Sequence, residues 1–343
     1  MSPPPIVALT QGDPAGIGPE ILLQLVAGHG AGVGWQALLI AERAALEAYS
    51  ASLPGAASDR FHYLTGKPSR QELSQLPAGT VAVLDPIAED RKISPGEPSV
   101  GDAAGALTAL DLGADLARLG TVDALVTAPL NKATIDRWVL PGFVGHTDYL
   151  AQGCGLERYG RDYLMAFLAP GLKVALLSTH VSLRQALDLV TAERIVEALL
   201  CWQRQAQGRI AVAGLNPHAG EGGLLGAEDD EEIVPAVARA RQLGVDCSGP
   251  SSADSLFARA REGACDWVLA LYHDQGLIAV KTAAFGLATN WTLGLPYLRT
   301  SVDHGTAYDI AGQGKADASS LRAVVETTLE LIAARKAATK IRS

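Results

Sequence analysis

Short apolar runs alternate with longer amphipathic stretches along almost the whole chain. Strands covered on both faces have apolar residues at successive positions, and this pattern occurs at residues 6–10, 35–41, 80–85, 124–128, 174–179, 210–215 and 266–272. Helical spacing occurs at residues 19–28, 101–119, 191–207, 231–243, 253–264 and 319–340. The alternation predicts an α/β/α sandwich built on a largely parallel sheet.

The length of the chain indicates more than one lobe. A chain of 343 residues is too long for one typical core and suits two lobes of ordinary size. It contains no internal repeat and no linker-like tract, so we expect the two lobes to share the chain. We predict a first lobe of residues 1–135 plus 285–343 and a second lobe of residues 136–284.

Composition and charge exclude several classes of protein. Charged residues make up 19% and hydrophobic residues 48%, which is typical of a globular rather than a disordered chain. The net charge of −9 argues against a nucleic-acid surface, which needs a basic footprint. A small anionic substrate needs only a local positive pocket and remains possible.

Cysteine spacing and the N-terminal segment predict a cytoplasmic protein. The cysteines show neither CxxC pairing nor zinc-ribbon spacing, so we expect them to be reduced and buried; they are Cys154, Cys201, Cys247 and Cys265. The opening "MSPPPIVALT" lacks the features of a signal peptide. No run approaches the ~18 apolar residues of a membrane span.

Three histidines follow predicted strands. His180 ends "LLSTH", His218 ends "GLNPH", and His273 follows the run "LALY". Ligands bind at the carboxyl ends of strands in open α/β sheets, and three neutral imidazoles suit a divalent metal with open positions. The alternative is that each histidine satisfies a local turn. His29 and His62 lie in glycine-rich or variable surroundings and are expected at the surface.

Other polar residues interrupt the strand and helix pattern. His146 and Thr147 stand at an apparent helix start, where an anion can be held, although Thr147 is equally suited to be an ordinary N-cap. Lys281 follows an apolar run, and Asn290 and Arg299 flank the stretch "WTLGLPYL". The two cations suit a phosphate or carboxylate, but solvated surface roles are the alternative.

A glycine-rich turn follows the first predicted strand. The stretch "QGDPAGIGPEILLQL" has the general form of an anion-binding turn, but it matches neither G-x-G-x-x-G nor the Walker lysine motif. The stretch "GEGGLLG" is only a partial match. A standard Rossmann module is therefore disfavoured.

Several of these motifs resemble one known family. The stretches "TQGDPAGIGPEI", "GHTDYL", "STHVSLR", "GLNPHAGEGG", "YHDQGL", "LGLPYLRTSVDHGTA" and "AGQGKAD" are similar to 4-hydroxythreonine-4-phosphate dehydrogenases of vitamin B6 biosynthesis. The resemblance extends to isocitrate and isopropylmalate dehydrogenases through "GDPAGIGPE" and "HGTAYDIAGQG". It implies their two-lobed fold, an active site in the cleft between the lobes, and a nicotinamide cofactor bound without a Rossmann fingerprint.

The resemblance assigns roles to individual residues. It implies metal ligands at His180, His218 and His273. It implies substrate contacts at His146, Thr147, Lys281, Asn290 and Arg299. The loop from Gly305 to Gly314 is expected to hold the adenosine part of the cofactor, with Gly305, Asp309 and Gly312 as its candidate binding residues. A cytoplasmic homodimer is implied, in which one of the three metal ligands can come from the partner subunit.

The implied reaction oxidises the secondary alcohol of 4-phosphooxy-L-threonine with NAD or NADP. A divalent metal acts as a Lewis acid, and the resulting 2-amino-3-oxo-4-phosphooxybutanoate decarboxylates to 3-amino-2-oxopropyl phosphate. Three imidazoles suit zinc or cobalt better than magnesium, although a loosely held site accepts several metals. Asp254 and Asp274 are candidate proton acceptors; Asp254 is alternatively the N-cap of its helix, and Asp274 alternatively supports His273.

Other functions fit parts of the same pattern. A paralogous dehydrogenase would act on a phospho-erythronate, a phospho-threonate or a carboxylated cis-diol and keep the three histidines. A zinc hydrolase would use the histidines and acids but not the "HGTAYDIAGQG" loop. The phosphate acyltransferases share the fold and need neither metal nor nicotinamide, and a non-catalytic binding protein is the remaining alternative.

Overall fold

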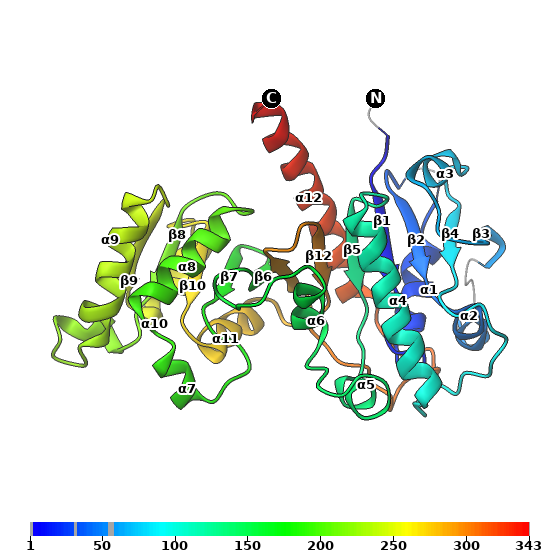
Figure 1. Ribbon diagram of the computed structural model, residues 1–343, viewed down its shortest axis with the longest axis horizontal. Coiled ribbons are helices and arrows are strands. Elements are labelled where there is room, and N and C mark those ends of the chain that lie inside the picture. The colour runs from blue at the N-terminus through cyan, green and yellow to red at the C-terminus, as the bar shows by residue number, and fades with distance from the viewer. Residues whose placement is uncertain (1–2, 31–32, 54–57, 343) are drawn as a thin grey trace. The chain divides into compact units, whose positions relative to one another are not determined.

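The computed structural model describes residues 3–30, 33–53 and 58–342. The chain forms two compact units, one of Met1–Tyr149 with Pro296–Ser343 and one of Leu150–Leu295 (Figure 1). The lobes predicted from the sequence end at residues 135 and 284, whereas the compact units change after residues 149 and 295. Residues 1–2 and 343 of the predicted first lobe lie outside the described part.

The first unit contains a parallel sheet. Its strands follow the order β3-β4-β2-β1-β5-β12, and each adjacent pair is parallel. They are β1 (Ile6–Thr10), β2 (Gln36–Ile40), β3 (Phe61–Leu64), β4 (Val81–Leu84), β5 (Ala124–Thr127) and β12 (Leu298–Ser301). The helical segments are α1 (Gly18–Ala27), α2 (Arg43–Ser50), η1 (Ser58–Arg60), α3 (Arg70–Gln75), α4 (Val100–Arg118), α5 (Lys132–Trp138), α6 (His146–Gln152) and α12 (Ser319–Arg342). Helix α6 ends just beyond the first unit.

Helices cover both faces of this sheet, as the alternation of side chains requires. A Cβ placed on Gly113 of α4 would lie 2.7 Å from the Leu125 side chain, so Leu125 faces α4. The next pair in register, Val126 and Thr300, points to the opposite face, where the Thr300 hydroxyl lies 2.7 Å from the Thr328 hydroxyl of α12. The sheet is therefore the middle layer of an α/β/α sandwich.

The second unit contains a mixed sheet. Its strands follow the order β11-β6-β7-β10-β8-β9, in which β7, β10, β8 and β9 pair in parallel while β6 is antiparallel to β7 and β11. The strands are β6 (Leu164–Ala169), β7 (Leu172–Leu176), β8 (Ile210–Ala213), β9 (Cys247–Ser251), β10 (Trp267–Ala270) and β11 (Thr289–Leu293). The helical segments are α7 (Leu183–Asp188), α8 (Ala192–Gln203), η2 (Pro217–Glu221), η3 (Asp229–Ile233), α9 (Val234–Gln242), α10 (Ala253–Arg261) and α11 (His273–Ala284).

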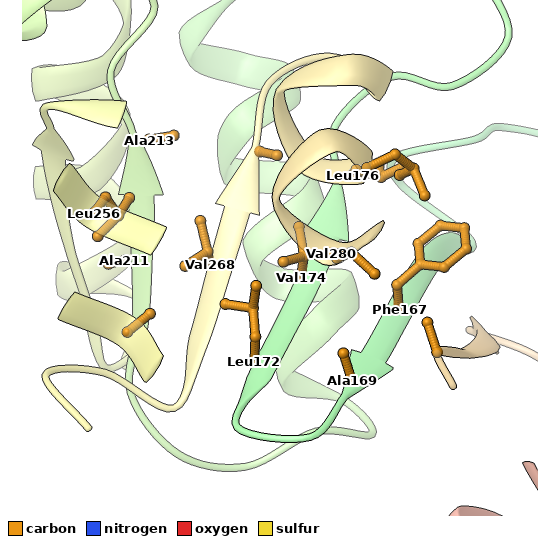
Figure 2. Close-up of a cluster of buried hydrophobic side chains, with 14 of the residues drawn as sticks. Phe167, Ala169, Leu172, Val174, Leu176, Ala211, Ala213, Leu256, Val268 and Val280 are labelled. Atoms are coloured by element: carbon orange, nitrogen blue, oxygen red, sulfur yellow. The ribbon is translucent and has the colours of Figure 1, made fainter. Parts of the chain in front are cut away.

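Apolar residues at alternate positions of this sheet pack under α10 and α11. Val174 and Leu176 of β7 and Val268 of β10 lie in one buried cluster with Leu256 of α10 and Val280 of α11 (Figure 2). All five side chains are nearly or fully excluded from solvent. This packing fixes where α11 begins on the sheet, and hence where His273 lies.

The structure confirms the α/β/α architecture and corrects several details. The run at 174–179 is β7 at Leu172–Leu176, so its last polar residues lie beyond the strand. Strands β3, β6, β9, β11 and β12 were missed because their partners in the sheet, not their local patterns, define them. The apolar stretch after His273 is helical, as part of α11, because it packs on β7 and β10.

The environments of several other residues were also predicted. His29 was expected at the surface but is buried, since its ring packs edge-on against Trp35 with centroids 4.7 Å apart. His62 is exposed, as expected. Cys201, Cys247 and Cys265 are buried, as expected, whereas Cys154 is partly exposed. Within the described ranges, no helix has the length and apolar character needed to cross a membrane.

Candidate active site

Two of the three predicted metal ligands lie side by side. The rings of His180 and His273 have centroids 5.4 Å apart and are tilted by 43°. His180 follows β7, and His273 is the first residue of α11 after β10, the parallel neighbour of β7. Thr179, Leu183 and Tyr272 line a pocket together with this pair.

Asp274 contacts the ring of His273. Its Oδ1 lies 2.7 Å from Nδ1 of His273, while 35% of the His273 side chain remains exposed. A carboxylate on Nδ1 favours the tautomer that leaves Nε2 free to bind a metal. This contact matches the supporting role considered for Asp274.

The loop that carries His218 is held by a buried carboxylate. Asp229, completely buried, accepts hydrogen bonds from the backbone N–H groups of Leu215 at 2.8 Å and Asn216 at 2.9 Å. His218 has φ of 52°, and Ala219 has φ of 53°. Such left-handed backbone is costly for non-glycine residues and persists where surrounding contacts impose it. The loop therefore presents His218, which is exposed, in an imposed conformation.

The three histidines do not form one complete ligand set in this structure. Among residues 3–30, 33–53 and 58–342, no group of three His, Cys, Asp or Glu side chains is placed to hold a metal. His218 instead lies close enough to Asp254 for its charge to lower the pKa of that carboxyl. Neutral imidazoles remain the ligand type that zinc and cobalt prefer, so the His180–His273 pair fits part of such a site.

Asp254 lies in the first turn of α10. The N-cap residue of that helix is Ser252, not Asp254, so the alternative N-cap role for Asp254 is wrong. The Ser252 hydroxyl donates to Oδ1 of Asp254 at 2.7 Å. This hydrogen bond is the main reason that the pKa of Asp254 is lowered. Asp254 is thus an exposed, ionised carboxylate beside His218.

Cationic and polar side chains gather in the first unit around Arg299. This side chain is 1% exposed, and its Nη2 donates to the Thr127 hydroxyl at 2.6 Å. Burial lowers the pKa of Arg299 to about 10. Burial also holds the pKa of His146 well below its usual value, with further contributions from the charges of Arg299 and Lys132. His146 is therefore neutral at physiological pH.

Lys132 lies against the backbone just before His146. Gly145 has φ of 137°, and a Cβ there would lie 2.8 Å from Cε of Lys132, so glycine permits this close approach. The Lys132 ammonium forms no salt bridge with any residue that the structure describes. Two cations and a neutral imidazole thus meet at one place, which suits an oxyanion.

The other predicted substrate residues differ in exposure. Thr147 is buried in the first turn of α6, which begins at His146 as expected. Asn290 lies on β11, and its buried Oδ1 has no hydrogen-bond partner among the described residues. Lys281 is exposed on α11, two helical turns after His273 and about 12 Å from it along the axis.

The predicted cofactor loop is tied to the glycine-rich turn. Buried Glu20 of α1 accepts hydrogen bonds from the N–H groups of Gly312 at 3.0 Å and Ala316 at 2.9 Å. The Tyr308 hydroxyl donates to Oδ2 of Asp13 at 2.6 Å, although burial raises the pKa of that carboxyl. These bonds give the loop a fixed conformation.

The predicted cofactor residues lie along this loop. Gly305 and Asp309 are exposed, and Gly312 is partly exposed. Of the described residues, none lies within 4 Å of a Cβ built on Gly305, so that part of the loop borders open space. The candidate cofactor residues are thus accessible on a fixed loop.

Several residues of these sites were not predicted. Lys132 directly follows the Asn131 side chain that caps α5, a context that signals only a helix start. Asp13 and Glu20 belong to the quoted "GDPAGIGPE" stretch, but their contacts lie almost 300 residues away in sequence. Asp229 belongs to a run of five consecutive acidic residues, 228–232, a pattern typical of a solvated surface, and only its burial distinguishes it.

The chain is similar to known proteins over most of its length. A family model described as "Pyridoxal phosphate biosynthetic protein PdxA" matches residues 35–328. The chain is 42% identical to the 4-hydroxythreonine-4-phosphate dehydrogenase of Acidithiobacillus ferrooxidans over 97% of this chain and 98% of the relative. It is 41% identical to the same enzyme of Pseudomonas putida over 94% and 97%.

Solved structures are also similar. The 4-hydroxythreonine-4-phosphate dehydrogenase of Klebsiella pneumoniae matches with a TM-score of 0.84 and 37% identity, covering 96% of this chain and 99% of that one. A terephthalate 1,2-cis-dihydrodiol dehydrogenase from Burkholderia xenovorans matches with a TM-score of 0.64 and 26% identity, covering 94% and 97%. The chain belongs to the family of the pyridoxal phosphate biosynthetic protein PdxA.

Proposed function

We propose that the chain oxidises 4-phosphooxy-L-threonine in a reaction that depends on NAD or NADP and on a divalent metal. The product, 2-amino-3-oxo-4-phosphooxybutanoate, then loses carbon dioxide to give 3-amino-2-oxopropyl phosphate. The observation that carries this proposal is the adjacent pair His180 and His273 in a chain whose relatives are named for this dehydrogenase. A pair of imidazoles at strand ends supports metal-assisted chemistry at that position.

The cationic residues of the first unit support a phosphorylated, carboxylated substrate. We assign the phosphate or carboxylate end of the substrate to Arg299, His146 and Lys132, with Thr147 beside them. Arg299 supplies a planar fork of donors that suits an oxyanion, and Lys132 supplies a second charge. Neutral His146 contributes one N–H donor, because burial and, secondarily, the neighbouring cations lower its pKa.

The second unit supplies the remaining predicted contacts. The unpartnered Oδ1 of Asn290 is an acceptor suited to the amino group of the substrate. Lys281 extends from the helix that begins with His273 and suits the other anionic end. Contacts that orient a substrate alcohol lower a barrier by ~7 kcal/mol in well-aligned cases.

Two bound groups would complete the chemistry. His180, His218 and His273 would hold a divalent metal, which would supply Lewis-acid stabilisation of negative charge on the alcohol oxygen. The loop from Gly305 to Gly314, including Asp309, would hold the adenosine part of a nicotinamide cofactor, which would supply a hydride acceptor. Zinc and cobalt suit imidazole ligands better than magnesium does.

The alcohol proton needs an acceptor. Asp254 is ionised, exposed and close to His218, so it remains the preferred candidate. Asp274 is engaged by the ring of His273, which supports a role in orienting that ligand. We assign proton transfer to Asp254 and orientation to Asp274.

A homodimer would complete the metal site. Only two of the three predicted ligands lie together, which supports the supply of one histidine by a partner subunit. Exposed apolar side chains near His180, including Val181 and Leu183 at 42% and 58% exposure, suit burial against a second copy. We place this dimer in the cytoplasm, where the buried thiols of Cys201, Cys247 and Cys265 would stay reduced.

A second candidate function has one specific observation in its favour. The Burkholderia xenovorans structure, named for a cis-dihydrodiol of terephthalate, is 26% identical to the chain. A dehydrogenase acting on such a carboxylated diol, or on phospho-erythronate or phospho-threonate, would keep the same histidines. The two cations Arg299 and Lys132 beside His146 favour a phosphorylated substrate.

Comparative turnover tests the proposal. Purified protein is assayed for NAD and NADP reduction with 4-phosphooxy-L-threonine, 4-phospho-erythronate, 4-phospho-threonate and the terephthalate cis-diol, each with and without added zinc or cobalt. We expect the highest kcat/KM with 4-phosphooxy-L-threonine, and activity only when metal is present. A higher kcat/KM with another substrate would reassign the function, and full activity in metal-free protein would exclude the metal role.

A further inference from the structure

The side chain of Gln275 joins two strand ends of the second unit. Its Oε1 accepts the backbone N–H of Leu271 at 2.7 Å, just after β10. Its Nε2 donates to the carbonyl of Gly214 at 2.9 Å, just after β8. Both groups of one amide are therefore used on backbone atoms of two neighbouring strand ends.

These strand ends lead to two of the predicted metal ligands. Leu271 precedes His273 by two residues, and Gly214 precedes His218 by four residues. The backbone of Leu271 is also held at its carbonyl, to which the Ser178 hydroxyl donates at 2.9 Å. Ser178 precedes His180 by two residues, so one hydrogen-bonded chain connects all three histidine-bearing strand ends.

Gln275 occupies a position where the helix start needs support. Within the described part of the chain, the N-cap residue Tyr272 makes no side-chain hydrogen bond to the first turn of α11. Gln275 stands at the third helical position and bonds back to the residue before the N-cap, and it thereby joins the helix start to the strand. The bond fixes the turn in which His273 and Asp274 lie.

Close packing keeps Gln275 in place. The next residue, Gly276, is buried, and a Cβ there would lie 2.6 Å from the Leu176 side chain and 3.0 Å from the Val174 side chain. Glycine therefore lets the first turn of α11 lie directly on β7. The partly buried amide of Gln275 is thus near the sheet edge, where it reaches both backbone groups.

We infer that Gln275 is a positioning residue that sets the placement of His273 relative to the His180 and His218 strand ends, and so tunes metal affinity. The inference rests on the proposed metal site. Residues that orient metal ligands contribute about 10- to 100-fold to metal affinity. Loss of the amide should therefore weaken metal binding without removing any ligand.

The test measures Co²⁺ binding to the full chain by its visible absorption, independently of turnover. Gln275→Met removes both hydrogen bonds and keeps the size of the side chain. Gln205→Met is the matched control, because the Gln205 amide also joins two backbone groups, Leu295 O at 2.7 Å and Gly294 N at 3.2 Å, in the same unit. Ser178→Ala removes the other bond to Leu271 and provides a milder second variant.

We expect Gln275→Met to raise the Co²⁺ Kd about 10- to 100-fold and to shift the absorption bands. Ser178→Ala should act in the same direction, and Gln205→Met should bind as the unmodified protein does. Equal binding by Gln275→Met and the unmodified protein would overturn the inference and leave the metal site intact. Equal weakening by Gln275→Met and Gln205→Met would overturn it as well, because the cause would be general loss of stability. Absence of Co²⁺ binding by the unmodified protein would instead overturn the proposed metal site and, with it, the inference.

Discussion

The rings of His180 and His273 lie 5.4 Å apart, centroid to centroid, although 93 residues separate them in the chain. Parallel pairing of β7 with β10 brings their strand ends together, and the first turn of α11 directs His273 back toward His180. Two imidazoles at this spacing suit a shared divalent cation.

Removal of either histidine should weaken metal binding. His180→Ala and His273→Ala are each expected to raise the Kd for Co²⁺ by more than ~100-fold, since even supporting residues contribute 10- to 100-fold. Equilibrium titration measures this change, and thermal unfolding of metal-free protein should differ little between the variants. His62→Ala, which removes an exposed histidine of the first unit, is the control and should bind Co²⁺ normally. Retention of tight binding by both alanine variants would argue against the paired site.

The buried charge of Arg299 should lower the stability of the fold while it strengthens anion binding. Burial lowers the pKa of Arg299 to about 10, below the unfolded value of 12.5. The charged side chain therefore reduces the free energy of unfolding, and this reduction is complete at every pH below about 10. Arg299→Met should therefore fold with equal or greater stability, while kcat/KM falls about 100-fold through loss of charge-assisted hydrogen bonds. Inorganic phosphate should raise the Tm of the unmodified protein but not of this variant.

The control for Arg299 is another arginine of the first unit. Burial also lowers the pKa of Arg335 on α12, so Arg335→Met removes another, partly buried cation. It should leave the phosphate-dependent rise in Tm unchanged. An unchanged phosphate-dependent rise in Tm in Arg299→Met would contradict the assignment of Arg299 to the anionic end of the substrate.

His146 should make the protein sensitive to acid. Its folded-state pKa lies well below the unfolded value of 6.5, so the unfolded state binds more protons between these values. The free energy of unfolding should be fully maintained above pH 6.5 and decrease as the pH falls toward the folded-state pKa. His146→Gln should flatten this decrease by at most ~1.4 kcal/mol per pH unit.

Urea unfolding between about pH 7 and pH 5 measures the slope. The comparison is best made in a His29→Gln background, because burial and the charge of Arg60 lower the pKa of His29 as well. An unchanged slope after His146→Gln would show that His146 is not desolvated in the folded protein.

Gly276→Ala should destabilise the second unit. The added Cβ would lie 2.6 Å from Leu176, 3.0 Å from Val174 and 3.1 Å from Ala270, and such overpacking costs about 1–3 kcal/mol. Chemical denaturation measures the change. Gly28→Ala is the control, because no described residue lies within 4 Å of a Cβ built there. Equal effects of the two substitutions would contradict the close packing of α11 on the sheet.

Tyr308→Phe should loosen the proposed cofactor loop. The substitution removes the 2.6 Å hydrogen bond to buried Asp13. This loss should destabilise the ordered conformation of the loop by about 1–3 kcal/mol. We expect the KM for NAD or NADP to rise several-fold, with a smaller change in the KM for the phosphorylated substrate. Tyr149→Phe breaks another tyrosine–aspartate bond of the first unit, to Asp111, and serves as the comparison. Equal changes in the KM for NAD or NADP in Tyr308→Phe and Tyr149→Phe would argue against a specific role of the loop in cofactor binding.

The amino-acid sequence by itself determined the layered architecture and the strand ends at which His180, His218 and His273 occur. Hydrophobic periodicity is a local property, so the long helices α4 and α12 and the buried strands β1, β2 and β8 could be predicted closely. Polar residues directly after apolar strands were visible in the same local pattern.

Tertiary structure alone decided which residues meet. Lys132 beside His146, Tyr308 on Asp13, and Gln275 between Leu271 and Gly214 depend on strand order and helix docking, which no local window contains. The burial of single residues was likewise not visible in the sequence, because His29 and Asp229 resemble surface residues in sequence yet lie inside the protein. Strands such as β6 and β11 were not predicted, because a strand is stabilised by pairing with its neighbours more than by its own composition.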